Sequence, residues 1–240
     1  MLVSSSGIVL STLRYSDSSV ITRIYTQQNG LRSFMVRTGK GKNTLRKLGL
    51  LQPLSLVQIS YSMDERKNLL QARSMEREIP IKTIPFNPIK SCITMFVAEV
   101  VGRSIKEEEA NESLFSYLRN SILLLDDSDV SPANFHLKFM LEFTRFLGFY
   151  PESNDSNRSF FDLSEGEFVA TVPIHPYFIE KPLTEIFDRM LNTGMSAYEQ
   201  VRMTNEQRRL LLQKLVDYYR LHLDGMKEIK SHKVLEEVLS

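Results

Sequence analysis

Three prolines within nine residues, Pro80, Pro85 and Pro88, divide this chain into two parts of different character. Proline has a fixed φ and no N–H group, so a cluster of prolines fits neither a helix interior nor a central strand. The residues before this stretch follow a strand pattern, and those after it follow a helical one. We therefore expect a β domain over residues 1–80 and a helical domain over residues 81–240, in an α+β chain.

The β part contains five segments that predict strands. They are rich in β-branched residues and partly alternate apolar with polar positions. The segments are Gly7–Leu13, Val20–Thr26, Leu31–Thr38, Leu54–Ser62 and Leu69–Ile79. Between the second and third lies Asn29-Gly30, a pair that tolerates the positive φ of a type I′ hairpin. Because closure leaves no exposed sheet edge, five short strands in about 80 residues favour a small closed barrel.

The charge of the β part is hidden by that of the remaining chain. Residues 1–85 carry 13 Lys and Arg against 5 Asp and Glu, a net +8, whereas residues 86–240 carry 17 against 24, a net −7. An excess of this size on a small β domain favours a polyanionic partner, with nucleic acid as the leading candidate.

The candidate nucleic-acid contacts are cations on the strands and in the glycine-containing segment Gly39 to Lys47, which we expect to be a loop. They are Arg14, Arg23, Arg32, Arg37, Lys40, Lys42, Arg46 and Lys47. Cations neutralise phosphates, and glycines let a backbone come close to them. A lysine-rich loop can also be an ordinary solvated turn. Tyr15, Tyr25 and Phe34 are candidates to stack on bases, with packing in the core as the favoured alternative for each.

After the prolines, apolar residues recur at helical spacing. We expect helices that begin at Asn87-Pro88, run over Glu109–Leu125, extend from Ser131-Pro132 to Gly148, resume near Leu183, start again at the capping box of Thr204 and Gln207, and end with Val234–Leu239. Phe135, Phe139, Phe143 and Phe146 should pack in the core. Between these helices, residues 160–172 predict a hairpin that turns at Glu165-Gly166.

No catalytic or cofactor signature is present in the sequence. The single cysteine, Cys92, excludes an intrachain disulfide and a thiolate zinc cage. The glycine-containing segment has neither the spacing nor the order of a phosphate-binding loop. We expect no catalytic residue, no metal and no cofactor. The lack of a signal segment or a long apolar run predicts a cytoplasmic protein that does not enter a membrane.

Several motifs occur in an order that resembles a known family. Gly7-Ile-Val-Leu10, Tyr15-Ser-Asp-Ser18, Tyr25-Thr26, Asn29-Gly-Leu31, Gly39-Lys-Gly-Lys42 and Leu51-Gln-Pro-Leu54 follow one another through the β part. Together they are similar to the N-terminal domain of the bacterial recombination mediator family RecO. The segment from Phe139 to Pro151, with Leu147-Gly148-Phe149, is similar to the central helix of that family.

This resemblance implies a five-stranded OB-fold barrel followed by an all-α domain. It also implies a protein that binds single- and double-stranded DNA and anneals complementary strands without a chemical step. With RecR, such a protein helps to load RecA onto strands coated by single-stranded DNA-binding protein, in the bacterial cytoplasm at the nucleoid. The helical domain would contact the acidic, apolar C-terminal tail of the coating protein. Lys138 occupies the place of a basic residue typical of that contact; a solvated helix lysine is the alternative.

One departure from the family concerns zinc. Many members carry a four-cysteine zinc module after the Leu-Gly-aromatic turn, whereas residues 152–180 here contain no cysteine. We expect a small hairpin insertion without zinc at this place, held by packing among Phe160, Phe161, Phe168, Val169 and Val172.

Two other functions remain compatible with the residues. The first is an OB-fold RNA-binding protein of translation or ribosome assembly. The second is a scaffold whose basic barrel binds acidic protein tails instead of a nucleic acid.

Overall fold

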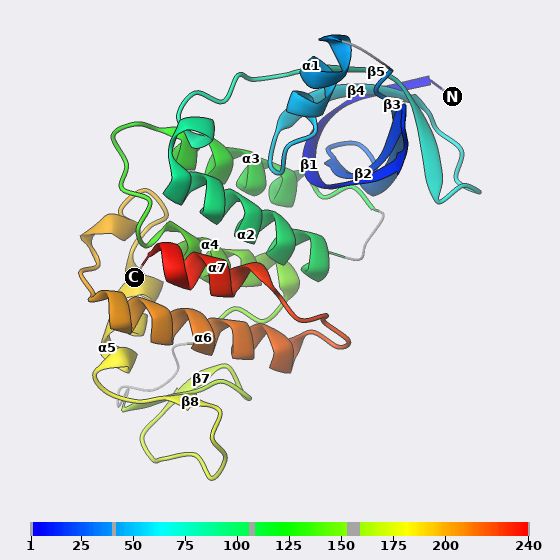
Figure 1. Ribbon diagram of the computed structural model, residues 1–240. Helices are drawn as coiled ribbons and strands as arrows, with labels where there is room; N and C mark the ends of the chain where they lie inside the picture. The colour runs from blue at the N-terminus through cyan, green and yellow to red at the C-terminus, as the bar shows by residue number, and fades with distance from the viewer. Residues whose placement is uncertain (1, 40–41, 106–108, 153–158, 240) are drawn as a thin grey trace. The chain divides into compact units, whose positions relative to one another are not determined.

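The computed structural model describes residues 2–39, 42–105, 109–152 and 159–239. Figure 1 labels most of the helices and strands. Lys40 lies outside the described residues, and at Lys42, Asn43, Leu45 and Arg46 only the backbone is described. The chain forms two compact units, residues 1–127 and residues 128–240.

The first unit begins with a closed five-stranded barrel (Figure 1). Its strands are β1 (Leu2–Ser16), β2 (Ser19–Thr26), β3 (Gly30–Arg37), β4 (Leu56–Ser62) and β5 (Leu69–Arg77). They close in the order β1-β2-β3-β5-β4, with antiparallel pairing everywhere except between β3 and β5. The five expected strands and the OB-type barrel are therefore confirmed, and helices follow the barrel as expected.

Gly7 lies in the part of β1 that pairs with two neighbouring strands. Its partners are Thr26 on β2 and Val57 on β4. A Cβ added at Gly7 would stand 2.6 Å from Ile24 Cγ2, closer than side chains approach each other. Only glycine therefore lets the backbone of β1 come this close to the barrel interior.

The barrel interior is filled by inward-facing side chains from all five strands. Val9, Ile24, Phe34, Ile59 and Tyr61 are completely buried or nearly so. Phe34 and Tyr61 meet edge to face, with ring centroids 4.8 Å apart. This packed interior leaves the outer face and the ends of the barrel for a ligand.

From Lys42 onward the basic segment after β3 is a helix, so the expectation of a loop was wrong for this part. This helix, α1 (Lys42–Leu50), follows β3, which ends at Arg37. Leu48 and Leu50 pack against the barrel core. This apolar contact, which depends on the folded barrel, stabilises a short helix that local turn signals did not predict.

Helices α2 (Pro88–Ser104) and α3 (Glu112–Asp126) complete the first unit, together with a short 3-10 turn, η1 (Ile84–Phe86). Asn87 caps α2 as predicted, because its side chain accepts a hydrogen bond from Lys90 N. The end of α3 holds the proline-containing linker: the Asp126 carboxylate accepts hydrogen bonds from the amides of Lys82, Thr83 and Ile84 at 2.8 to 3.0 Å.

The second unit is built on α4 (Phe135–Leu147), α5 (Leu183–Asn192), α6 (Asn205–His222) and α7 (Ser231–Val238), with a short turn, η2 (Tyr198–Gln200). Phe135, Phe139 and Phe143 are buried and stacked along α4, with successive ring centroids 6.1 and 5.6 Å apart. Their predicted core role is confirmed, whereas Phe146 is only partly buried. The capping box of Thr204 and Gln207 at the start of α6 is also confirmed.

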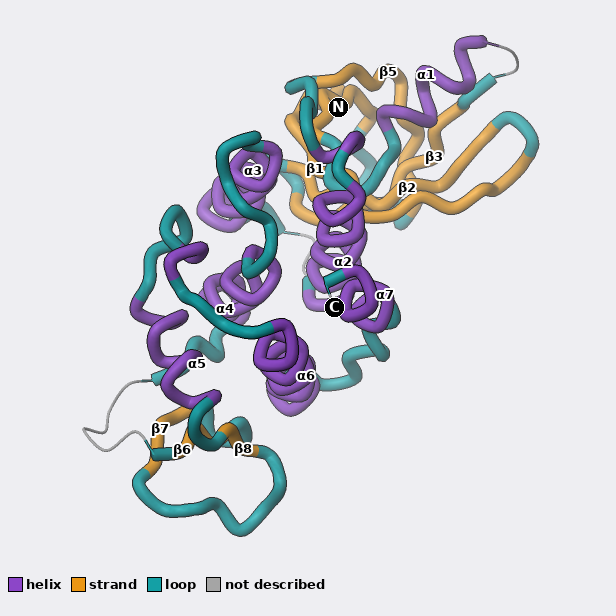
Figure 2. The backbone as a smooth tube through the Cα atoms, turned by 60° about the vertical axis from the view of Figure 1, so that its left-hand side comes forward, coloured by secondary structure: helices purple, strands orange, loops and turns teal. Residues whose placement is uncertain are grey.

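A small sheet occupies the place of the expected hairpin (Figure 2). Its strands are β6 (Phe160–Asp162), β7 (Glu167–Val169) and β8 (Phe178–Ile179), in the order β7-β6-β8. The turn at Gly166 is confirmed, since this glycine has φ +75°. The third strand was not predicted. The expected packing of Val172 was wrong, because that side chain is 61% exposed and lies in the loop before β8.

Within the described part of the chain, no helix combines the length and the apolar character needed to cross a membrane.

Candidate nucleic-acid interface

Three of the predicted contacts, Arg14, Arg37 and Lys47, belong to one end of the barrel. Arg14 pairs with Val20 across β1 and β2, and the adjacent Ser19 pairs with Arg37 on β3. Lys47 extends from α1 and donates a hydrogen bond from Nζ to the Arg37 carbonyl at 2.8 Å. All three side chains are exposed, although Arg14 forms an ion pair with Asp17 at 2.8 Å.

Arg23 and Arg32 do not join this group. Arg23 lies on the outer face of β2, where Nη1 donates to the carbonyl of Gly102 at the end of α2. Arg32 lies near the β2–β3 turn and donates from Nε to the Asn29 carbonyl. Both side chains are partly buried. These contacts within the unit separate the two arginines from the Arg37 end of the barrel.

Of the remaining predicted cations, Lys40 lies outside the described residues. Lys42 and Arg46 lie in α1, without a described side chain.

A groove opens beside Arg37, between the end of β3, helix α1 and the middle of β5. Its volume is about 690 Å³, within the range of about 300 to 1,000 Å³ that is typical of ligand sites. The lining residues are Val36, Arg37, Lys47, Leu50, Gln71, Ala72, Arg73, Ser74 and Met75. We call this feature the basic groove, because its described lining holds three cations and no carboxylate.

The strand pairing explains why the basic groove exists. The parallel ladder between β3 and β5 covers only Ser33 to Met35 on one strand and Leu69 to Gln71 on the other. Beyond this ladder β5 continues to pair with β4 as far as Arg77, whereas β3 ends and the chain turns at Gly39, which has φ +76°. The two strands therefore separate, and α1 lies close to β5 (Figure 2).

Arg73 was not among the predicted contacts. It lies at an irregularity in the β4–β5 ladder, between the pairs Ser60–Ser74 and Tyr61–Ala72, and its Nε donates to Ser62 Oγ at 3.0 Å. Its side chain is exposed on the wall of the basic groove. The only sequence signal for it was its place in the basic block, because a local bulge cannot be read from residue alternation.

The three candidate stacking residues have different environments. Phe34 belongs to the barrel core, and Tyr25 is 1% exposed and stacks on Phe115 of α3 at 6.3 Å. Core packing, the favoured alternative, is therefore confirmed for both. Tyr15 is 63% exposed near the β1–β2 turn.

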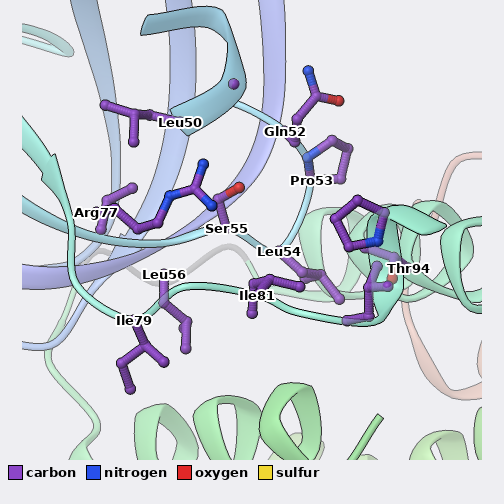
Figure 3. A pocket seen from close by; sticks show the side chains of 14 residues that line it. Leu50, Gln52, Pro53, Leu54, Ser55, Leu56, Arg77, Ile79, Ile81 and Thr94 are labelled. Atoms are coloured by element: carbon purple, nitrogen blue, oxygen red, sulfur yellow. The ribbon is translucent and has the colours of Figure 1, made fainter. Parts of the chain in front are cut away.

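Two other hollows lie on the first unit. One, of about 500 Å³, adjoins the β4–β5 turn and shares Gln71 with the basic groove, but it is lined by both Asp64 and Lys67. The other is a mainly apolar hollow of about 90 Å³ between the segment around Leu54 and the proline-containing linker (Figure 3). This volume is far below the range of about 300 Å³ and more that ligand sites occupy.

Lys138, the predicted partner contact, is buried in the second unit. Its side chain is 0% exposed and its Nζ lies 2.6 Å from Glu142 Oε1. The same ammonium donates to the carbonyls of Met190 and Leu191 in the last turn of α5, at 3.0 and 3.4 Å. Burial lowers the pKa of Lys138 and the bond to Glu142 opposes this effect. The alternative of a solvated helix lysine is wrong, and a partner would reach this group only after a rearrangement.

The titratable side chains of the described residues are the candidate ligands for a metal ion. Among the described residues, no group of three or more His, Cys, Asp and Glu side chains is arranged to hold a metal ion. Beside the small sheet, His175 Nε2 lies 3.2 Å from Asp162 Oδ2 of β6.

Comparison with known proteins covers both parts of the chain. The family model described as recombination protein O N terminal matches residues 1–77, and the model described as recombination protein O C terminal matches residues 85–232.

Full-length relatives extend this match. The chain is 37% identical over 241 residues to the DNA repair protein RecO of Phocaeicola vulgatus, with all of both chains covered. It is 33% identical over 245 residues to that of Flavobacterium psychrophilum, also with full coverage of both. It is 35% identical over 240 residues to that of Bacteroides fragilis, with 99% of each covered. The resemblance seen in the ordered motifs is thus confirmed, and the chain belongs to the RecO family of DNA repair proteins.

Proposed function

We propose that this protein is a non-enzymatic recombination mediator that binds single- and double-stranded DNA and anneals complementary strands. The basic groove is the observation that carries the proposal. Among the described residues, Arg37, Lys47 and Arg73 form no ion pair. Three cations without a carboxylate partner, on the wall of a groove of ligand size, attract phosphate groups more strongly than scattered surface charges do.

The proposed mechanism is electrostatic. Two complementary strands repel each other through their phosphates, and cations on the barrel offset this repulsion while the bases remain free to pair. The exposed Arg14 lies at the same end of the barrel, paired with Asp17, and the predicted contacts Lys40, Lys42 and Arg46 lie between Arg37 and Lys47 in the sequence. Arg23 and Arg32, which are hydrogen-bonded within the unit, would contribute to the field of the barrel more than to direct contacts.

Partner proteins complete the proposed role. With RecR, the protein would help to load RecA on strands coated by single-stranded DNA-binding protein, at the bacterial nucleoid. We propose that the helical domain, residues 81–240, recognises the acidic tail of the coating protein. A direct contact by Lys138 would require its ammonium to leave Glu142 and two helix carbonyls, so this residue is also a candidate for a structural role.

A strand-annealing assay tests the proposal. Complementary oligonucleotides, one of them coated with single-stranded DNA-binding protein, are mixed with and without the protein, and duplex formation is followed by fluorescence. We expect faster annealing with the protein, and loss of this effect after charge reversal at Arg37, Lys47 and Arg73. Unchanged annealing would contradict the mediator role. Tighter binding of structured RNA than of DNA in competition would favour the RNA-binding alternative.

A further inference from the structure

The basic groove has features that distinguish a single strand from a duplex. Its cations, Arg37, Lys47 and Arg73, stand on three different elements around the opening. Its lining also includes four apolar side chains that belong to the barrel core or pack against it: Val36, Leu50, Ala72 and Met75. A site lined by both cations and apolar side chains fits a ligand that carries anionic groups and a flat apolar part.

Two cations of the basic groove are held by hydrogen bonds. Lys47 Nζ donates to the carbonyl at the end of β3 at 2.8 Å, and Arg73 Nε donates to Ser62 on β4 at 3.0 Å. Each bond uses only part of the donor capacity of its cation: an ammonium has three N–H groups and a guanidinium has five. The remaining donors can meet phosphate oxygens without first losing these bonds.

We propose that the basic groove is a subsite for one or two nucleotides of single-stranded DNA, an inference that rests on the proposed function. Their phosphates would meet Arg37, Lys47 and Arg73, and an unstacked base would lie against the apolar side chains of the lining. A base in a duplex is stacked and paired, so it cannot reach these side chains, and duplex DNA is left with contacts to exposed cations. The subsite therefore gives the barrel a preference for single strands.

The neighbouring hollow supports the placement of the phosphates. It shares Gln71 with the basic groove but contains Asp64, which pairs with Lys67 at 3.3 Å. The backbone amide of Arg66 and the ammonium of Lys67 lower the pKa of Asp64, so this carboxylate stays ionised at neutral pH. The ionised Asp64 offsets the charge of Lys67 there, so of the two hollows that share Gln71 the basic groove attracts a phosphate more strongly.

Two variants of the full-length protein test the subsite. The charge variant combines Arg37→Gln, Lys47→Gln and Arg73→Gln. Its matched control combines Arg66→Gln, Arg77→Gln and Lys82→Gln, which removes three exposed charges from the same unit outside the basic groove. The filling variant Ser74→Leu changes no charge; Ser74 is exposed on the groove wall, so the fold should tolerate the larger side chain.

Affinity is measured for oligo(dT) and for a duplex of the same length, between 50 and 200 mM salt. With about 0.7 counterions released per single-strand phosphate, loss of three contacts should flatten the log–log salt slope for oligo(dT) by about 2. At 50 mM salt, the charge variant should weaken oligo(dT) binding about tenfold more than the control does. The filling variant should weaken oligo(dT) binding at least about threefold and leave duplex binding unchanged.

The outcomes separate this inference from the function on which it rests. If the charge variant behaves like its control, or if the filling variant weakens both ligands equally or neither, the subsite is wrong even though DNA binding and annealing stand. If the wild-type protein binds neither form of DNA, the proposed function fails as well.

Discussion

Replacement of Lys138 by methionine separates a structural role for this residue from a partner-binding one. Lys138→Met keeps the length and apolar stem of the side chain but removes its charge and its donors. In the wild-type protein the Lys138 side chain is fully buried. Its ammonium bonds to Glu142 at 2.6 Å and to the carbonyl of Met190 at 3.0 Å. The substitution therefore removes polar contacts without leaving a cavity.

The expected loss can be worked out from these contacts. The Met190 carbonyl lies in the last turn of α5, where no intrahelical donor is available, and leaving it unpaired costs about 1 to 3 kcal/mol. Removing one partner of a buried ion pair costs about 3 to 5 kcal/mol. That figure is an upper bound here, because Glu142 is 19% exposed and keeps Arg145 at 2.8 Å. The variant also no longer pays the desolvation cost of a buried ammonium, which offsets part of the loss of stability. We expect a net destabilisation of about 2 kcal/mol.

Urea unfolding followed by circular dichroism measures this loss, with Lys181→Met as the matched control. Lys181 also pairs with a glutamate four residues later, Glu185, at 3.4 Å, but these two side chains are 62% and 60% exposed. The control should lose less than about 0.5 kcal/mol. Equal stability of Lys138→Met and the wild type would refute the structural role. If that variant also lost affinity for an acidic tail peptide, Lys138 would instead be a partner contact.

Three further perturbations test other parts of the structure. Charge reversal at Lys40, Lys42, Arg46 and Lys47 should weaken single-stranded DNA binding and flatten its salt dependence, and unchanged affinity in a fluorescence titration would count against a DNA contact in this segment. Gly7→Ala should lower the free energy of unfolding by about 1 to 3 kcal/mol, because its Cβ would overlap Ile24; a Tm equal to that of the wild type would show that the barrel relaxes without cost. Burial opposes ionisation of Asp126, but the amides of Ile84, Lys82 and Thr83 outweigh it and hold the pKa below the usual 3.8. The stabilisation by Asp126 is therefore fully present well above pH 3.8 and should be lost as the pH falls through the lowered pKa. The variant Asp126→Asn, which loses the bond to Lys82 N, should unfold at a lower urea concentration at pH 7, and its stability should depend less on acid pH.

The barrel could be predicted because its signals are local. β-branched alternation marks the strands, and Asn29-Gly30 supplies a turn whose conformation depends only on those two residues. The start of α6 was predictable for the same reason, since Thr204 and Gln207 satisfy each other's neighbouring N–H groups. Helix α1 could not be predicted in this way, because Leu48 and Leu50 gain their stabilisation from a core that exists only after the strands close.

The candidate site was harder to predict from the sequence, because the charge of a residue does not show where its side chain points. Arg23 and Arg37 are both strand arginines in the basic block, yet one donates to the end of α2 and the other lines the basic groove. Arg73 required knowledge of a bulge, and Lys138 required knowledge that α4 is buried over nearly its whole circumference at that level. In each case the deciding fact is a tertiary neighbour.

The small sheet illustrates how packing can hold a short segment in position. Strands of two and three residues are too short to be stable alone. Phe161 contacts Phe187 of α5 and Tyr218 of α6, with ring centroids 4.5 and 5.8 Å apart. Gly166 contributes to the same contact, since any Cβ there would lie 2.8 Å from the Tyr218 hydroxyl. A metal would close the segment on itself through local ligands, whereas these aromatic contacts tie it to two helices. The sheet and these helices should therefore unfold together, so a change in the sheet is felt in the helical core of residues 128–240.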